Sequence, residues 1–310
     1  MLKKWFLLTM IVMPSLFFLM IPVVPEFWET AEYYYIDDMM ESKAHLFARN
    51  SDVIIAGDSR AHFGLDPKHI KKKTGKSAVN VSAYSVGPVM QNDNLKVNDV
   101  DLKNTTLIIN VSAFSLNDGV KRPTYYSNAI IRRLSIIERF EQFYPDNIET
   151  LIKYASSSLK YKIKSSVSED KFIGSLGFNA ANGSLKKSDI RPSEIKGAYN
   201  KFWYQNWGIH GHKRKHLESA IKELKDRSKK IILIQMPLSD SFKKHSGHLW
   251  EEVEMQAELS DIARIYNIEF ISFLDNKSFS DDDFFDLVHL NSQGANRLTT
   301  LLLKNTTVAE

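Results

Sequence analysis

Five short apolar segments, separated by helical patterns, constrain the fold of this chain more than any other feature. The segments are Val53–Ala56, Val79–Ser82, Leu107–Val111, Ile231–Gln235 and Ile268–Phe273. Helical periodicity lies between them, most clearly over residues 212–228 and 249–266. Strands that alternate with helices form parallel sheets, because a parallel pair needs a long crossover that a helix usually supplies. The sequence therefore predicts an α/β domain built on a mainly parallel, doubly wound sheet.

The first apolar segment ends in Gly57, Asp58 and Ser59. This order places Ser59 at the carboxyl end of the first strand, the edge at which open parallel sheets bind ligands. Asp58 is interpreted as a structural residue that holds the turn presenting Ser59. A helix is expected after the turn, beginning at Pro67 and ending at Gly75.

A second polar group lies close to the end of the chain, where Asp286 precedes His289 by three residues. Asn291 or Ser292 is expected to cap a closing helix. A serine hydroxyl becomes a good nucleophile when a histidine takes its proton and a carboxylate fixes the histidine tautomer. Ser59 and His289 are 230 residues apart, so only the fold can bring these groups together.

The strand that ends in Gly57-Asp58-Ser59 and the terminal Asp286-Leu-Val-His289 resemble the SGNH (GDSL-type) hydrolase superfamily. This resemblance implies a three-layer α/β/α sandwich with a mainly parallel five-stranded sheet, similar to the flavodoxin fold. It also implies that Ser59 is the nucleophile, His289 the general base and Asp286 its orienting carboxylate. The resemblance covers about half of the chain, and the middle takes no part in it.

The family also has two sequence blocks that supply an oxyanion hole. The stretch 79–87 matches the first of them, in which the backbone amide of Ser85 or Gly87 takes this role. The other block normally gives an asparagine after the next strand. Asn117 fits that block in composition but falls several residues late, whereas Asn110 falls early. The resemblance therefore implies Ser85, Gly87 and Asn117 as candidate oxyanion residues and leaves the identity of the second donor open.

Arg60 directly follows the candidate nucleophile. Two interpretations stay open at this point. Arg60 either binds a carboxylate or carbonyl of the substrate, or forms a buried ion pair with a nearby acidic residue.

Composition argues against several other classes of protein. The net charge is +4 and no basic tract is interleaved with aromatic residues, so nucleic acid is not an expected partner. The chain has no cysteine, which excludes disulfides and thiolate metal sites. His210, His212 and His216 have no acidic residue between them and are not expected to bind a metal. No cofactor is predicted.

The N-terminus predicts a membrane anchor. Lys3 and Lys4 precede an apolar stretch over residues 5–24, about the length that spans a bilayer. We expect an uncleaved signal anchor over residues 1–25 and a juxtamembrane helix over 26–50; a cleaved signal peptide is the alternative. The two lysines favour the cytoplasmic side for the N-terminus. The catalytic domain is then expected on the periplasmic or extracellular side of the inner (cytoplasmic) membrane, as a single-pass protein.

The domain is expected to span residues 51–310, with an insertion over about 115–205. A direct crossover needs only about a dozen residues, so this segment is far too long to be one. We expect a helical insertion or lid beside the site.

The anchor and the motifs together resemble the membrane-tethered SGNH proteins that modify bacterial surface glycans. This resemblance implies a serine O-acyltransferase or O-acetylesterase that acts on a cell-envelope polysaccharide through an acyl-enzyme. It implies an acylated glycan or an acyl donor as substrate, with a multispanning membrane acyltransferase as a partner. Two alternatives stay open: a lipid or general carboxylester hydrolase, and a catalytically inert scaffold in polysaccharide assembly or export.

Overall fold

The computed structural model describes residues 43, 45–47, 49–84, 86–120, 176–185 and 203–309. These residues belong to one compact unit, Ser42–Arg122 with Lys171–Glu310. The predicted anchor, the rest of the juxtamembrane segment and most of the predicted insertion lie outside the described residues, so those assignments stay predictions. Within the described ranges, no helix combines the length and the apolar character needed to cross a bilayer.

The core of the described unit is a five-stranded sheet in the order β2-β1-β3-β4-β5, and every neighbouring pair is parallel. The strands are β1 (Val53–Ala56), β2 (Ala78–Asn80), β3 (Thr106–Asn110), β4 (Lys230–Gln235) and β5 (Glu269–Ser272). The predicted parallel α/β fold is therefore confirmed. Strand β2 ends earlier than expected, at Asn80, whose side-chain oxygen accepts a hydrogen bond from the Ser82 N–H.

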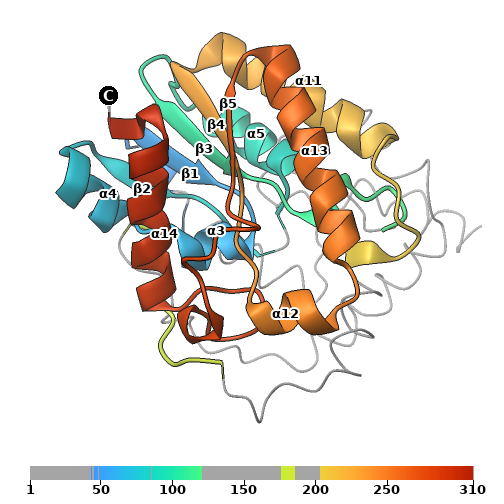
Figure 1. The fold of residues 1–310 in the computed structure, drawn as a ribbon. Helices are drawn as coiled ribbons and strands as arrows, with labels where there is room; N and C mark the ends of the chain where they lie inside the picture. The colour runs from blue at the N-terminus through green and yellow to red at the C-terminus, as the bar shows by residue number, and fades with distance from the viewer. Residues whose placement is uncertain are drawn as a thin grey trace, which may run out of the picture. The chain divides into compact units, whose positions relative to one another are not determined.

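Helices cover both faces of the sheet (Figure 1). On one side lie α3 (Ser59–Gly64), α4 (Pro67–Thr74) and α14 (Ser292–Asn305); on the other lie α5 (Pro88–Val97), α11 (His212–Arg227) and α13 (Leu249–Tyr266). The shorter elements are α6 (Ala113–Leu116), α12 (Asp240–His245) and the 3₁₀ helices η4 (Asp281–Asp283) and η5 (Thr307–Ala309). The two long helices expected from periodicity, α11 and α13, form where predicted, and the unit has three layers.

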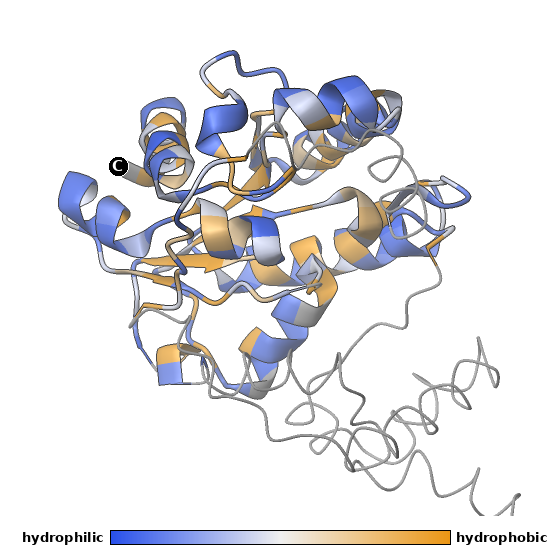
Figure 2. Ribbon diagram, turned by 90° about the horizontal axis from the view of Figure 1, so that it is seen from below, coloured by the Kyte–Doolittle hydropathy of each residue, from blue (hydrophilic) through white to orange (hydrophobic). Residues whose placement is uncertain are grey.

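The strands supply the apolar centre of the unit, as the hydropathy colouring in Figure 2 shows. Alternate strand residues pack against α3 and α14, and each buried aliphatic side chain contributes about 1.5–3 kcal/mol. This cluster includes Val53, Ile55, Ile108, Ile232, Ile234, Ala61, Leu65, Leu298 and Leu302. Helices α3 and α14 both pack on this cluster and contact each other, and α3 begins at the carboxyl edge of the sheet, directly after β1.

Local capping sets where the helices near this edge begin and end. Helix α4 ends at Gly75, whose φ of +75° suits glycine, as the sequence predicted. The Asn291 side chain caps α14 by accepting the N–H groups of Gln293 and Gly294. Sequence reasoning missed α3, the short helix that begins directly at Ser59.

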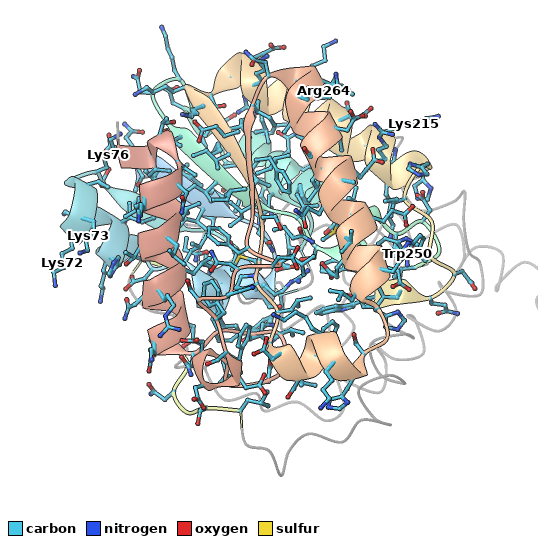
Figure 3. The ribbon with its side chains drawn as sticks, viewed as in Figure 1. Lys72, Lys73, Lys76, Lys215, Trp250 and Arg264 are labelled. Atoms are coloured by element: carbon cyan, nitrogen blue, oxygen red, sulfur yellow. The ribbon has the colours of Figure 1, made fainter. Side chains whose placement is uncertain are left out.

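The lysine-rich last turn of α4 faces solvent. Lys72 and Lys73 are exposed and point away from the sheet (Figure 3). They lie near the carboxyl end of the helix, where positive charge interacts favourably with the helix dipole. This run is therefore a solvated helix face that also supports the end of α4.

Three consecutive aspartates, residues 281–283, would ordinarily form an exposed turn, but the last of them is buried here. Asp283 is buried, and its Oδ2 accepts hydrogen bonds from Arg297 Nη1 at 2.6 Å and from Ser280 N at 3.0 Å. The run forms η4 and closes against α14, and it thereby fixes the chain just before the histidine loop.

Candidate active site

A tight turn between β1 and α3 presents Ser59. Gly57 has φ +146°, and a Cβ built on it would lie 2.8 Å from the Cβ of Asn110. Only glycine therefore fits between β1 and the end of β3. Ser59 follows two residues later as the first residue of α3, at the carboxyl edge of the sheet that its sequence position predicted.

Asp58 holds this turn in place. Its buried carboxylate accepts hydrogen bonds from the Arg60 N–H at 2.9 Å, from Asn110 Nδ2 at 2.7 Å and from the Ser112 hydroxyl. The structural interpretation of Asp58 is confirmed. Asn110 is the last residue of the neighbouring strand β3 and Ser112 follows it, so they tie the nucleophile turn to the middle of the sheet. Sequence reasoning missed this pairing, although the adjacency of β1 and β3 could have suggested it.

The fold brings the three predicted catalytic side chains into one relay. Ser59 Oγ lies 2.7 Å from His289 Nε2, and His289 Nδ1 lies 2.7 Å from Asp286 Oδ2. The second oxygen of Asp286 accepts the N–H groups of Val288 and His289 at 2.9 and 2.8 Å. The carboxylate is therefore fixed by its own loop, and the imidazole is held between it and the serine.

The charge on Asp286 selects the histidine tautomer. Burial acts to raise the pKa of Asp286, but the hydrogen bond and charge of His289 and the two backbone amides outweigh it and lower the pKa below its ordinary value of 3.8. Asp286 is therefore ionised at neutral pH and accepts the proton on Nδ1 of His289. This leaves Nε2 free to accept the proton of Ser59, as a general base must.

Two phenylalanines fix the plane of the imidazole. The ring of Phe285 stacks on His289, with centroids 5.6 Å apart and planes 15° from parallel. Phe63, on α3, meets His289 edge to face at 5.3 Å. Both lie within four residues of a catalytic side chain, yet aromatic residues at such positions carry no distinctive signal, and sequence reasoning did not single them out.

The oxyanion candidates have different outcomes. Ser85 lies outside the described residues. Gly87 caps α5, and its loop lies beside the nucleophile turn, since Ala83 N and Gln91 Nε2 both donate to the carbonyl of Gly57, at 3.1 and 3.2 Å. Within the described ranges, the N–H groups of Ser59 and Gly87 have no hydrogen-bond acceptor.

Asn117 does not supply the donor that the resemblance implied. Its side chain is buried, and its amide hydrogens donate to the carbonyls of Trp203 and Gln205 at 2.9 and 3.1 Å. Its carbonyl accepts the N–H groups of Gly119 and Gly208, both at 3.0 Å. Asn117 therefore joins two distant chain segments, and its amide has no hydrogen left for an oxyanion.

Arg60 points away from solvent and is 1% exposed. Its Nε donates to Ser112 Oγ at 3.2 Å, its Nη1 lies 4.0 Å from Glu252 Oε1, and its guanidinium lies 5.2 Å from the centre of the Trp203 ring. These contacts agree with the buried ion pair rather than with a group that binds substrate. Because Arg60 directly follows Ser59, these contacts help to hold the turn that presents Ser59.

The described residues contain no group of three or more histidines and carboxylates placed to hold a metal ion. His210 Nδ1 lies 3.3 Å from Glu258 Oε2, and His212 Nδ1 lies 2.9 Å from Asp118 Oδ1. These two histidines therefore face different carboxylates.

Comparisons with known proteins add similarities at the level of the backbone. No protein-family model matches the sequence, and no curated protein matches it. The chain is similar to the structure of an acetylxylan esterase from Geobacillus stearothermophilus, with 10% identity, 82% of this chain and 93% of that chain covered, and a TM-score of 0.40. It is also similar to a carbohydrate acetylesterase from Sinorhizobium meliloti, with 10% identity, 81% and 96% covered, and a TM-score of 0.41.

An extracellular lipase from Streptomyces rimosus gives 8% identity, 83% and 100% covered, and a TM-score of 0.40. The assignment of the site therefore depends on the contacts of its own residues.

Proposed function

We propose that this chain is a serine O-acyl hydrolase or O-acyltransferase of the SGNH type. The observation that carries the proposal is the hydrogen-bonded relay from Ser59 Oγ through His289 to Asp286. A serine that contacts the free nitrogen of a histidine, whose other nitrogen contacts an ionised carboxylate, is arranged for nucleophilic attack.

In the proposed reaction, Ser59 Oγ attacks the acyl carbon and His289 Nε2 takes the hydroxyl proton. Asp286 stabilises the imidazolium that forms. The protonated histidine then gives its proton to the leaving alcohol, which departs and leaves an acyl group on Ser59. Water or a second alcohol then attacks the acyl carbon while His289 takes its proton. The bond between the acyl group and Ser59 Oγ breaks, His289 returns the proton to Oγ, and the acyl group is released as an acid or as a new ester.

The tetrahedral intermediate of each step carries a negative oxygen, which needs hydrogen-bond donors. We assign the N–H groups of Ser59 and Gly87 to this role, because within the described ranges neither has an acceptor. Loss of one such donor typically slows the chemical step by about 100- to 1000-fold. The engaged amide of Asn117 makes these two backbone groups the donors on which the proposal depends.

We further propose a cell-envelope glycan as the substrate, with the enzyme held at the inner membrane and its catalytic domain on the outer side. The apolar stretch over residues 5–24, preceded by Lys3 and Lys4, supports the anchor. In this setting the acyl donor is an acylated glycan or a group passed on by a multispanning membrane acyltransferase. A sugar hydroxyl as acceptor gives transfer, and water gives hydrolysis.

The test uses the full chain in detergent and the matched Ser59→Ala variant. Acetate release is measured from an activated acetyl ester and from an O-acetylated polysaccharide, with and without a deacetylated polysaccharide as acceptor. Turnover that is lost in Ser59→Ala supports the proposal, and a longer-chain ester turned over faster than acetyl would favour the lipid or general carboxylester hydrolase instead.

A catalytically inert scaffold is the second candidate, and the occupied amide of Asn117 is the observation that favours it. An oxyanion site that lacks its side-chain donor is what loss of catalysis would leave behind. Absence of turnover in a folded protein, with no acyl group on Ser59, would select this candidate.

A further inference from the structure

Residues 176–185, here called the strap, lie within the predicted insertion but contact the catalytic unit along their whole length. The first half binds near the nucleophile. The Leu176 carbonyl accepts a hydrogen bond from Asn80 N at 2.9 Å, and Asn179 N donates to the carbonyl of His62 at 3.4 Å. His62 follows Ser59 by three residues on α3, so this half of the strap contacts the nucleophile helix.

The second half of the strap binds the loop that carries the general base. The Ala181 carbonyl accepts hydrogen bonds from Ser292 N at 2.9 Å and Ser292 Oγ at 2.8 Å. The Gly183 carbonyl accepts from Asn291 Nδ2 at 2.9 Å. These contacts lie two and three residues after His289.

The last residue of the strap completes this attachment. Leu185 N donates to the carbonyl of Phe284 at 2.7 Å. Phe284 lies two residues before Asp286, so the strap binds the histidine loop on both sides of the Asp286–His289 pair.

We propose that the strap is a positioning element that sets the distance between Ser59 and His289. The inference rests on the proposed function, since it concerns the geometry of the same relay. The strap joins the nucleophile helix to both flanks of the histidine loop by hydrogen bonds of its backbone. A ligand that displaced the strap would therefore also displace the catalytic histidine.

A second contact reinforces the end of the strap near α3. Lys43 Nζ is buried and contacts His62 Nδ1 at 2.9 Å and the carbonyl of Ser82. His62 is thus held through its ring by Lys43 and through its carbonyl by Asn179 of the strap. Leu46, on the same turn as Lys43, packs against Gly177. Two segments outside the sheet therefore meet at the nucleophile helix.

The energetic consequence falls on catalysis more than on folding. The hydrogen bonds of the strap involve loop backbone, and each makes only a small net contribution to stability. A displacement of a catalytic group by about 1 Å can cost about 100-fold in rate. Loosening the strap should therefore lower kcat much more than it lowers the melting temperature.

The variant Gly177→Ala tests this directly. Gly177 has φ +82°, and a Cβ would lie 1.9 Å from the carbonyl oxygen of Asn80, a backbone atom that cannot move aside cheaply. The matched control is Gly75→Ala, where φ is +75° and a Cβ meets nothing within 4 Å. Both variants carry similar backbone strain, and only the first displaces the strap.

Full-length wild type, Gly177→Ala and Gly75→Ala are compared in kcat and KM for an activated acetyl ester, and in melting temperature. We expect turnover by Gly177→Ala to be about 10- to 100-fold slower than turnover by Gly75→Ala, with KM little changed. Turnover within about threefold of the control would overturn the proposal. Should Gly177→Ala fail to fold, Ser292→Ala, which removes one bond to Ala181 without steric conflict, decides the question by a several-fold fall in kcat or its absence.

Hydrogen exchange separates this proposal from the proposed function. The amides of residues 284–292 should exchange faster in Gly177→Ala than in Gly75→Ala, whether or not the protein turns over esters. Unchanged exchange of these amides would overturn the proposal that the strap positions the histidine loop. If exchange is faster in Gly177→Ala but the wild type does not turn over esters, the positioning role of the strap is supported and the proposed function is refuted.

Discussion

Asp58 gives a prediction whose magnitude follows from its contacts. Replacing it with alanine removes the cap of α3, which is worth about 1 kcal/mol. It also leaves the Asn110 amide and the Ser112 hydroxyl buried without their acceptor, at about 1–3 kcal/mol each. We therefore expect Asp58→Ala to lower the free energy of unfolding by about 3–7 kcal/mol, and the melting temperature by about 10 °C.

Asp66→Ala is the matched control, because Asp66 caps α4 in the same way but, among the described residues, its side chain accepts only the Lys68 N–H, at 2.8 Å. This variant should lose about 1 kcal/mol. Asp58→Asn keeps one acceptor oxygen and should fall between the two. Urea denaturation followed by circular dichroism measures all three. Equal losses in Asp58→Ala and Asp66→Ala would refute the account of the buried network.

The remaining predictions concern Asp286, Lys43 and Asn117. Asp286→Asn should lower kcat by several orders of magnitude, because the asparagine no longer holds His289 in the required tautomer, and steady-state kinetics on an acetyl ester measures this. The folded protein holds the pKa of Asp286 below its ordinary value of 3.8. The ionised carboxylate therefore stabilises the fold above pH 3.8, and this stabilisation is lost as the pH falls through the lower pKa of the folded state. The difference in melting temperature between wild type and Asp286→Asn should accordingly shrink below about pH 4. Burial lowers the pKa of Lys43 in the folded protein well below its ordinary value of 10.5. Between the folded-state pKa and 10.5, the unfolded chain therefore binds a proton on Lys43 that the folded protein does not hold. The melting temperature of wild type should then rise relative to that of Lys43→Met as the pH rises from neutral toward about 10. A difference in melting temperature that stays constant over this pH range would contradict the lowered pKa. Asn117→Ala should destabilise the fold by about 2–4 kcal/mol because it leaves four backbone groups unpaired; turnover slowed by about 100-fold or more in the folded variant would instead return Asn117 to the oxyanion hole.

The parts of the site that could be predicted from sequence are those set by local chemistry. Gly57 marks a turn after an apolar strand, and Asp286 reaches His289 within one short loop. Parallel strands bring their carboxyl ends to one edge, which accounts for the meeting of Ser59 and His289 across 230 residues. Element boundaries at α4 and α13 followed from a capping glycine and from periodicity.

The parts that sequence reasoning missed depend on contacts between distant segments. Asn117 has a suitable composition around it, but long-range hydrogen bonds to residues 203–208 decide what its amide does. Lys43 is charged, and charged residues are rarely buried, so the sequence did not predict that Lys43 would be buried in contact with His62. The strap has no periodicity, and its role is visible only from the carbonyl and amide groups that it presents.

The central claim is that Ser59 becomes acylated, and mass spectrometry of the intact chain tests it most directly. Full-length protein is incubated with an activated acetyl ester and the reaction is stopped with acid. The intact mass is then measured and compared with that of Ser59→Ala treated in the same way. We predict one added acetyl group in the wild type, located by peptide mapping to Ser59 and absent from the variant. A folded wild-type protein with no adduct, or with the same adduct in Ser59→Ala, would contradict the account.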